Sequence, residues 1–112
     1  MSEISQFKAA FFKALAHPLR IRILDALRQG EVGVNELSAR LGVEQSHLSQ
    51  QLAILRGRNV VVGRKDGNGV FYSVADPQIL KLLDVAKSIF NNHLIDLRDL
   101  LSQLEDAPGS RK

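Results

Sequence analysis

The stretch GVEQSHLSQQLAIL, residues 42–55, combines a helical apolar stripe with a polar but uncharged face. Its leucines recur three and four residues apart, which is the spacing of a helix that packs against a core. The opposite side carries groups that both donate and accept hydrogen bonds: Ser46, Ser49 and Gln50. A helix face that needed only solubility would more often carry Lys and Glu. The stretch therefore predicts a helix over about residues 45–56 whose outer face binds a hydrogen-bonding partner.

The residues before this stretch predict a short helix that ends in a tight turn. Val34, Leu37 and Leu41 share helical spacing, and Gly42 ends the pattern. A short helix, a turn and a second helix with a polar outer face form a helix-turn-helix. Glu44 stands where a helix cap is expected, and its carboxylate would repel a nearby phosphate.

The residues after it change from helical to strand periodicity. VVVGR and VFYSV are rich in branched and aromatic residues and enclose the polar turn KDGNG, which is a strong hairpin signal. We therefore expect a wing near residues 60–74, with Arg64 and Lys65 near its tip. The predicted fold class is mostly α with a two-stranded β-hairpin wing (α+β), a winged helix-turn-helix.

Two outer helices complete the predicted fold. Apolar residues at helical spacing predict a first helix over residues 3–16, and Asp76-Pro77 opens a last helix that reaches about Glu105. That helix is apolar over too wide an arc for one small domain to cover, so we expect it to pack against a second copy of the chain. The predicted homodimer interface consists of Ile4, Phe7, Phe11, Ile89, Phe90, His93, Leu97, Leu100 and Leu104. We expect one domain over residues 1–106 and a frayed tail at 107–112.

Composition narrows the class of protein. The 112 residues suit one compact domain, and a hydrophobic content of 45% argues against general disorder. The absence of cysteine excludes disulfides and thiolate sites. No transmembrane segment or signal peptide is visible, so we expect a cytoplasmic protein, associated with the nucleoid and not with a membrane.

Charge distribution and groove chemistry point to double-stranded DNA. Residues 40–65 hold five basic side chains against Glu44 alone, whereas residues 76–106 hold six acids against three basic side chains. Base edges in the major groove present donors and acceptors, which Ser and Gln satisfy, whereas phosphates attract Arg and Lys. The predicted DNA contacts are Gln45, Ser46, His47, Ser49, Gln50, Arg56, Arg64 and Lys65.

Two other classes of function compete with DNA binding. A winged-helix protein–protein module would use the same serine and glutamine face to dock a partner. An enzyme would need a catalytic set, and no phosphate-binding glycine loop, zinc-protease motif or nucleophile elbow is present in the sequence. We therefore predict a sequence-specific DNA-binding transcriptional regulator that is not an enzyme.

One known family carries the same motifs. KALAHPLRIRILDALRQGEVGVNELSARLGVEQSHLSQQLAIL, followed by VVVGRKDGNGVFYSV, resembles the ArsR/SmtB family of bacterial winged-helix repressors from about Phe7 to Val74. The resemblance implies a homodimer built from the first and last helices. It also implies that the recognition helix and wing of each protomer face a pseudo-palindromic operator. Binding there represses transcription until an inducer, typically a metal ion, releases the protein.

The sequence departs from this family at both of its metal sites. Gly33 and Asn35 occupy the cysteine positions of the thiolate site, and neither supplies sulfur. At the second site His93 and Asp96 match one half, but the other half falls near leucines, and two ligands are too few for tetrahedral zinc. We predict no metal and no other cofactor, and the inducer stays unassigned. A metal-responsive repressor that uses His93 and Asp96 is the alternative.

Overall fold

The computed structural model describes residues 2–106 of the 112-residue chain. The tail predicted at residues 107–112 lies outside the described residues. By its internal contacts the chain forms two compact units, Met1–Leu80 and Lys81–Lys112. The single domain expected from the sequence stays a prediction.

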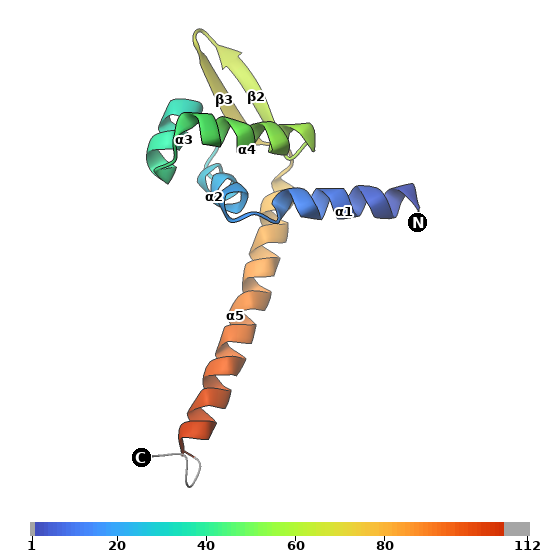
Figure 1. Ribbon diagram of the computed structural model, residues 1–112, viewed down its shortest axis with the longest axis vertical. Helices are drawn as coiled ribbons and strands as arrows, with labels where there is room; N and C mark the ends of the chain where they lie inside the picture. Colours follow the sequence, from blue (N-terminus) through green and yellow to red (C-terminus); the bar gives the residue numbers. More distant parts are fainter. Residues whose placement is uncertain (1, 107–112) are drawn as a thin grey trace. The chain divides into compact units, whose positions relative to one another are not determined.

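The first unit holds all the short elements of the fold (Figure 1). In chain order they are α1 (Glu3–Leu15), α2 (Pro18–Ala26), β1 (Val32–Gly33), α3 (Val34–Leu41), α4 (Gln45–Gly57), β2 (Val61–Asp66) and β3 (Gly69–Val74). The last helix, α5 (Pro77–Asp106), begins in the first unit and continues through the second. The mostly helical fold with a β-hairpin wing, predicted from the sequence, is confirmed.

Side-chain caps fix where two of the helices begin. His17 Nδ1 accepts a hydrogen bond from the Leu19 amide at the start of α2, at 3.1 Å. Asp76 Oδ1 accepts one from the Gln78 amide at the start of α5, at 2.9 Å. In both helices the cap is followed by proline, whose missing N–H has no partner to lose at the first helical position. The predicted Asp76 cap is confirmed.

The core of the first unit lies where α2, α3 and α4 meet β2. Eight side chains there are almost inaccessible to solvent: Ile23, Leu24, Leu37, Leu48, Leu52, Leu55, Val60 and Val61. Burying one such side chain stabilises the fold by about 1.5–3 kcal/mol. The three leucines that define the stripe of residues 42–55 are all in this set, so α4 is held by the face that the sequence assigned to the core.

The wing belongs to a small antiparallel sheet with strand order β1-β3-β2. β2 and β3 are joined by a two-residue turn in which Gly67 has a φ of 62°, a left-handed conformation that favours glycine. The sequence did not predict β1, because two residues are too few to show strand alternation. β1 pairs Gly33 with Phe71 of β3 and so fastens the start of α3 to the wing.

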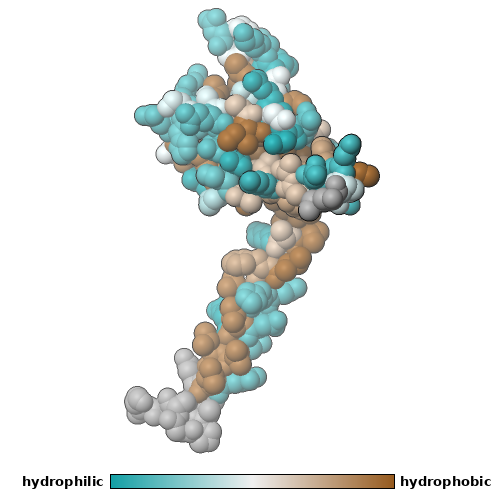
Figure 2. Space-filling model, turned by 45° about the vertical axis from the view of Figure 1, so that its right-hand side comes forward, coloured by the Kyte–Doolittle hydropathy of each residue, from teal (hydrophilic) through white to brown (hydrophobic). Residues whose placement is uncertain are grey.

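The second unit is the helical segment 81–106 of α5, and its apolar side chains are exposed. Figure 2 shows them as a hydrophobic stripe beside hydrophilic residues. The stripe contains Val85, Ile89, Phe90, Leu94, Leu97, Leu100, Leu101 and Leu104. Among residues 2–106 no helix is both long and apolar enough to cross a membrane.

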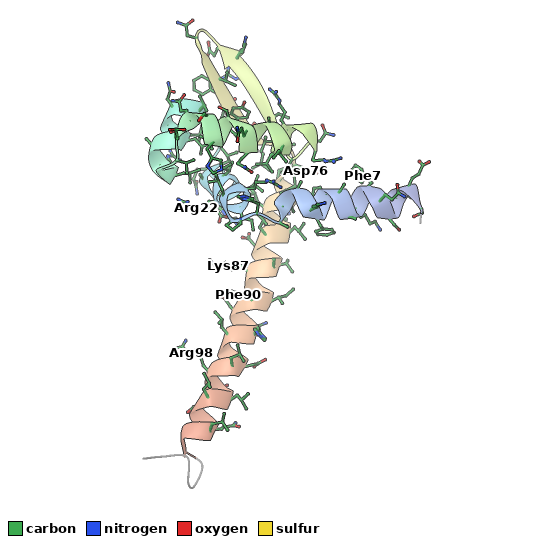
Figure 3. The ribbon with its side chains drawn as sticks, viewed as in Figure 1. Phe7, Arg22, Asp76, Lys87, Phe90 and Arg98 are labelled. Atoms are coloured by element: carbon green, nitrogen blue, oxygen red, sulfur yellow. The ribbon has the colours of Figure 1, made fainter. Side chains whose placement is uncertain are left out.

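The apolar stripe of α1 is also uncovered. Ile4 is 68% exposed and Phe7 67% exposed, while Phe11 is half-buried. Figure 3 shows Phe7 on α1 and Phe90 on α5. Of the residues predicted to form a dimer interface, Phe11 is half-buried and all the others are exposed in the single chain.

Candidate nucleic-acid interface

The turn between α3 and α4 is set by one glycine and one serine. Gly42 adopts the left-handed conformation (φ 65°, ψ 37°), as a residue that ends a helix often does. The carbonyl oxygen of Ser38 accepts from the amides of Gly42 (2.9 Å) and Val43 (3.2 Å). The Ser38 hydroxyl donates to the Val43 carbonyl. These contacts fix the angle at which α4 leaves α3.

One face of α4 is buried and the other is open. The buried face consists of Leu48, Gln51, Leu52 and Leu55. The exposed side holds five of the predicted DNA contacts, which are Gln45, Ser46, His47, Ser49 and Gln50, and Arg56 is exposed in the last turn of α4. The structure therefore brings these side chains together on one accessible helix. Their contacts to DNA stay a prediction.

Two side chains at the start of α4 are engaged within the chain. Gln45 Nε2 donates to Asn35 Oδ1 on α3. Ser46 Oγ donates to a Glu44 carboxylate oxygen at 2.7 Å, and Glu44 makes no side-chain cap to the backbone of α4. The carboxylate is therefore held next to the end of the helix that favours anions. Gln45 and Ser46 keep acceptor oxygens for an incoming donor.

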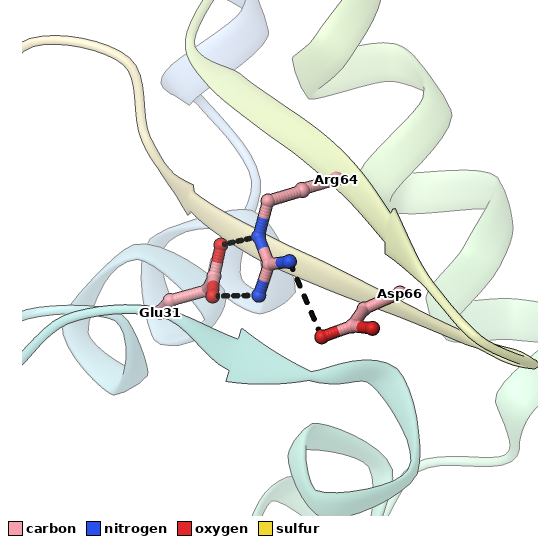
Figure 4. A network of polar contacts seen from close by, with 3 residues as sticks. All are labelled: Glu31, Arg64 and Asp66. Carbon is pink, nitrogen blue, oxygen red and sulfur yellow. Dashed lines mark hydrogen bonds and ion pairs between the residues drawn. The ribbon is translucent and has the colours of Figure 1, made fainter.

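Arg64 of β2 is the centre of a polar network on the wing (Figure 4). Its guanidinium donates from Nε to one Glu31 oxygen (3.0 Å) and from a terminal nitrogen to the other (2.7 Å). Asp66 lies 3.4 Å from the remaining terminal nitrogen, and the guanidinium lies 5.3 Å from the centre of the Phe71 ring. The bidentate pair joins the residue before β1 to the hairpin.

The same network shifts the pKa of Glu31 and of Arg64. Hydrogen bonds from Arg64 hold the pKa of the Glu31 carboxyl below its ordinary value, and those to Glu31 and Asp66 raise the pKa of Arg64. Because the pKa of Glu31 is lowered on folding, the pair stabilises the wing above the ordinary pKa of glutamate. That contribution is lost as the pH falls through the lowered value. Both groups are solvent-accessible, so water screens the pair.

Lys65 differs from its neighbour in the same strand. Arg64 is paired across the hairpin with Phe71 and Lys65 with Val70, so the two side chains leave opposite faces of the sheet. Within residues 2–106 the Lys65 ammonium makes no hydrogen bond or ion pair. Of the two predicted wing contacts, Lys65 is the one whose charge is not already balanced by carboxylates.

Sequence reasoning missed the residues that hold α4 from behind. Arg20 of α2 donates from Nε to Gln51 Oε1 at 2.8 Å, and it donates to the carbonyls of Lys13 and Ala14 at the end of α1. Arg22, labelled in Figure 3, donates to the Leu41 carbonyl at the end of α3, at 2.9 Å. One signal was available, since Gln51 is a polar residue at a core position of the helical pattern.

The two residues at the family's thiolate positions, Gly33 and Asn35, have structural roles here. A Cβ at Gly33 would lie 3.1 Å from the Phe71 ring, so a larger residue would crowd it. Asn35 accepts from Gln45. Within residues 2–106 no three His, Asp or Glu side chains are close enough to share a metal ion. Gly33 and Asn35 therefore do not fit the thiolate metal site that the resemblance implies.

The chain is similar to a known family of bacterial regulators and to three individual proteins described below. The profile described as "Bacterial regulatory protein, arsR family" matches residues 17–62, which span α2 to the start of β2. The uncharacterised HTH-type transcriptional regulator Rv0081 of Mycobacterium tuberculosis is 48% identical over 106 residues, 94% of this chain and 92% of the relative. The crystal structure of Rv0081 has a TM-score of 0.78 at 46% identity and covers 86% of this chain and 97% of that chain.

The other two relatives carry more descriptive names. A biofilm growth-associated repressor of Agrobacterium fabrum is 39% identical over 82 residues, 73% of this chain and 70% of the relative. The solution NMR structure of the homodimeric winged helix-turn-helix DNA-binding domain of Mb0332 from Mycobacterium bovis is 28% identical. It has a TM-score of 0.75 and covers 84% of this chain and 91% of that chain. All three relatives are named as transcriptional regulators, a repressor or a DNA-binding domain, and none as an enzyme.

Proposed function

The chain belongs to the arsR family of bacterial regulatory proteins, and from this premise we propose that it is a homodimeric transcriptional repressor that reads a pseudo-palindromic operator. The helix α4 enters the major groove and the β2–β3 hairpin contacts the adjacent backbone. Its place of action is the cytoplasm, at the nucleoid.

The observation that carries the proposal is the two-sided character of α4. Its leucines are buried together with Gln51, while Gln45, Ser46, Ser49 and Gln50 are exposed to solvent. An α-helix fits the major groove, and small neutral groups read base edges there without the desolvation cost of a charge. Arg56 in the last turn of α4 and Lys65 on the wing are exposed cations, of the kind that holds phosphates.

The homodimer is supported by two uncovered apolar stripes in one chain, on α1 and on residues 81–106 of α5. Exposed contiguous apolar surface of this extent marks an interface. The relative from Mycobacterium bovis is homodimeric by its own description. Two-fold symmetry then presents two copies of α4 roughly 34 Å apart, which is one turn of DNA.

The first prediction separates base reading from backbone holding. Ser49→Ala and Gln50→Ala should each weaken binding to an operator selected from random duplexes by about 1–3 kcal/mol. Binding to a duplex of unrelated sequence should hardly change, because these side chains contact bases and not phosphates. Gel-shift titrations with both duplexes measure the difference. Equal losses on both duplexes would contradict the assignment.

The second prediction concerns the wing. Lys65→Gln should weaken binding to operator and unrelated duplex alike, and it should reduce the slope of log affinity against log salt by about one per protomer. Lys81→Gln, a matched exposed lysine outside the wing, serves as the control and should leave the slope unchanged. A Lys65→Gln protein with the original slope would remove this residue from the DNA contacts.

The same salt titration tests the competing function. A winged-helix module that docks a protein through the α4 face has no counterions to release from DNA, so it should show no steep salt-dependent affinity for random duplex. Absence of any duplex binding in dilute buffer would favour that module over the repressor.

A further inference from the structure

A cavity lies between α1, α2 and the C-terminal part of α4 in the first unit. Its volume is about 370 Å³, at the small end of the roughly 300–1,000 Å³ typical of ligand pockets. It is lined by Ala10, Lys13, Ala14, Arg20, Ile54 and Arg58. Residues of α1 form one wall, and the others come from α2 and from α4 with the residue that follows it.

The lining is basic on one side and apolar on the other. Three of its six residues are cations and none is an acid. Within the part of the chain that the structure describes, the Lys13 ammonium and the Arg58 guanidinium make no hydrogen bond or ion pair. Three like charges around one cavity repel one another, and a bound anion removes that repulsion. Ala10, Ala14 and Ile54 supply an apolar wall for a hydrocarbon group.

Arg20 connects this cavity to α4. Its Nε donates to Gln51 Oε1 at 2.8 Å, and a terminal nitrogen donates to the carbonyls of Ala14 (3.1 Å) and Lys13 (3.4 Å). Gln51 is buried, so its oxygen has no water to replace a lost partner. An anion in the cavity offers Arg20 a charge-assisted hydrogen bond, which is stronger than one to a neutral amide or carbonyl. An anion that draws the Arg20 guanidinium away from Gln51 weakens the contact that holds α4.

We propose that this cavity binds a small organic anion, a carboxylate with a short apolar group, and that its occupation weakens operator binding through Arg20 and Gln51. The effect on DNA rests on the repressor function proposed above, whereas binding of the anion does not. A phosphate of the DNA backbone suits the cavity less well, because a stiff duplex contacts protruding side chains and Arg20 is half-buried.

The test uses the full-length, 15N-labelled protein and three probes at constant ionic strength. Sodium benzoate carries both the charge and the apolar group, benzyl alcohol lacks the charge, and inorganic phosphate lacks the apolar group. We expect benzoate to shift the backbone amides of the lining residues and the side-chain amide of Gln51 in a saturable manner, in roughly the millimolar range. Benzyl alcohol should give no saturable shift, and phosphate should bind at least a few-fold more weakly.

Variants assign the effect to the cavity. The double substitution Lys13→Gln and Arg58→Gln should weaken benzoate binding at least ten-fold while the amide spectrum stays dispersed as in the parent protein. Lys8→Gln, on the same helix but outside the lining, should bind benzoate as the parent does. Saturating benzoate should weaken operator binding about five-fold or more in the parent and not in the double variant.

The results separate three claims: the organic-anion site, its coupling to operator binding and the repressor function. Absence of a saturable benzoate shift, or phosphate binding as tight as benzoate binding, overturns the organic-anion site. Weaker duplex binding by the double variant without any loss of benzoate binding assigns these cations to DNA and also overturns it. Benzoate binding that leaves operator affinity unchanged overturns the coupling. A protein that binds benzoate but no duplex keeps the site and refutes the repressor function.

Discussion

Phe90→Asp is expected to convert the protein into a monomer that binds its operator about 100-fold more weakly or worse, a loss of about 2.8 kcal/mol. Phe90 lies on the exposed apolar stripe of α5, where it is 58% exposed in the single chain. In a dimer built on this stripe its ring would be buried in both protomers, and the substitution would bury two carboxylates in an apolar contact. Their desolvation costs several kcal/mol per charge, which an interface of this kind does not repay.

The comparison variant is Asn92→Asp, which places the same carboxylate on the polar side of the same helix. Its position is exposed and differs from that of Phe90 by about 200° around the helix. Sedimentation equilibrium should show a dimer for Asn92→Asp and a monomer for Phe90→Asp, with operator affinity following the oligomeric state. A Phe90→Asp protein that remains dimeric would exclude this stripe as the dimer contact.

The fold was predictable because its helices obey one periodicity. The leucine spacing of residues 42–55 placed α4, and the leucines of α4 are buried as the pattern required. The wing was predictable from a change of period around a glycine-containing turn. β1 was not predictable, since its pairing with β3 joins residues about 40 positions apart and two residues carry no alternation.

In the candidate site, too, local features were predictable from the sequence, whereas contacts between residues far apart in the chain were not. Which side of α4 is exposed is a local property, and Ser46, Ser49 and Gln50 were assigned correctly to the outer face. The partner of Arg64 is Glu31, 33 residues earlier, and only the folded sheet brings the two together. Arg64 and Lys65 are adjacent in sequence and looked equivalent, yet the structure neutralises one and leaves the other without an ion pair among the described residues.

Polar contacts between helices separate two basic residues of α2 from the cations available to DNA. Arg20 and Arg22 contribute to the positive charge of the chain, but their guanidinium groups donate to Gln51 and to backbone carbonyls of neighbouring helices. A charge count alone cannot separate a cation that attracts DNA from one that fixes the position of a helix. In this fold Arg20 and Arg22 are of the second kind.

Leu52→Ala should lower the free energy of unfolding by about 2–5 kcal/mol, because it leaves a cavity in the core that supports the whole helix-turn-helix. Leu52 is completely buried in the face of α4 that meets the core. Ile54→Ala removes a similar side chain from the same helix, but Ile54 is 40% exposed, so its loss should cost well under half as much.

Urea unfolding followed by circular dichroism at one fixed protein concentration measures both changes, since unfolding of a dimer depends on concentration. Below the unfolding transition, Leu52→Ala should keep most of its operator affinity, because the exposed serines and glutamines of α4 are untouched. Equal destabilisation by the two substitutions would mean that α4 is not held by its leucine face. The recognition surface would then lack the rigid support that reading base edges requires.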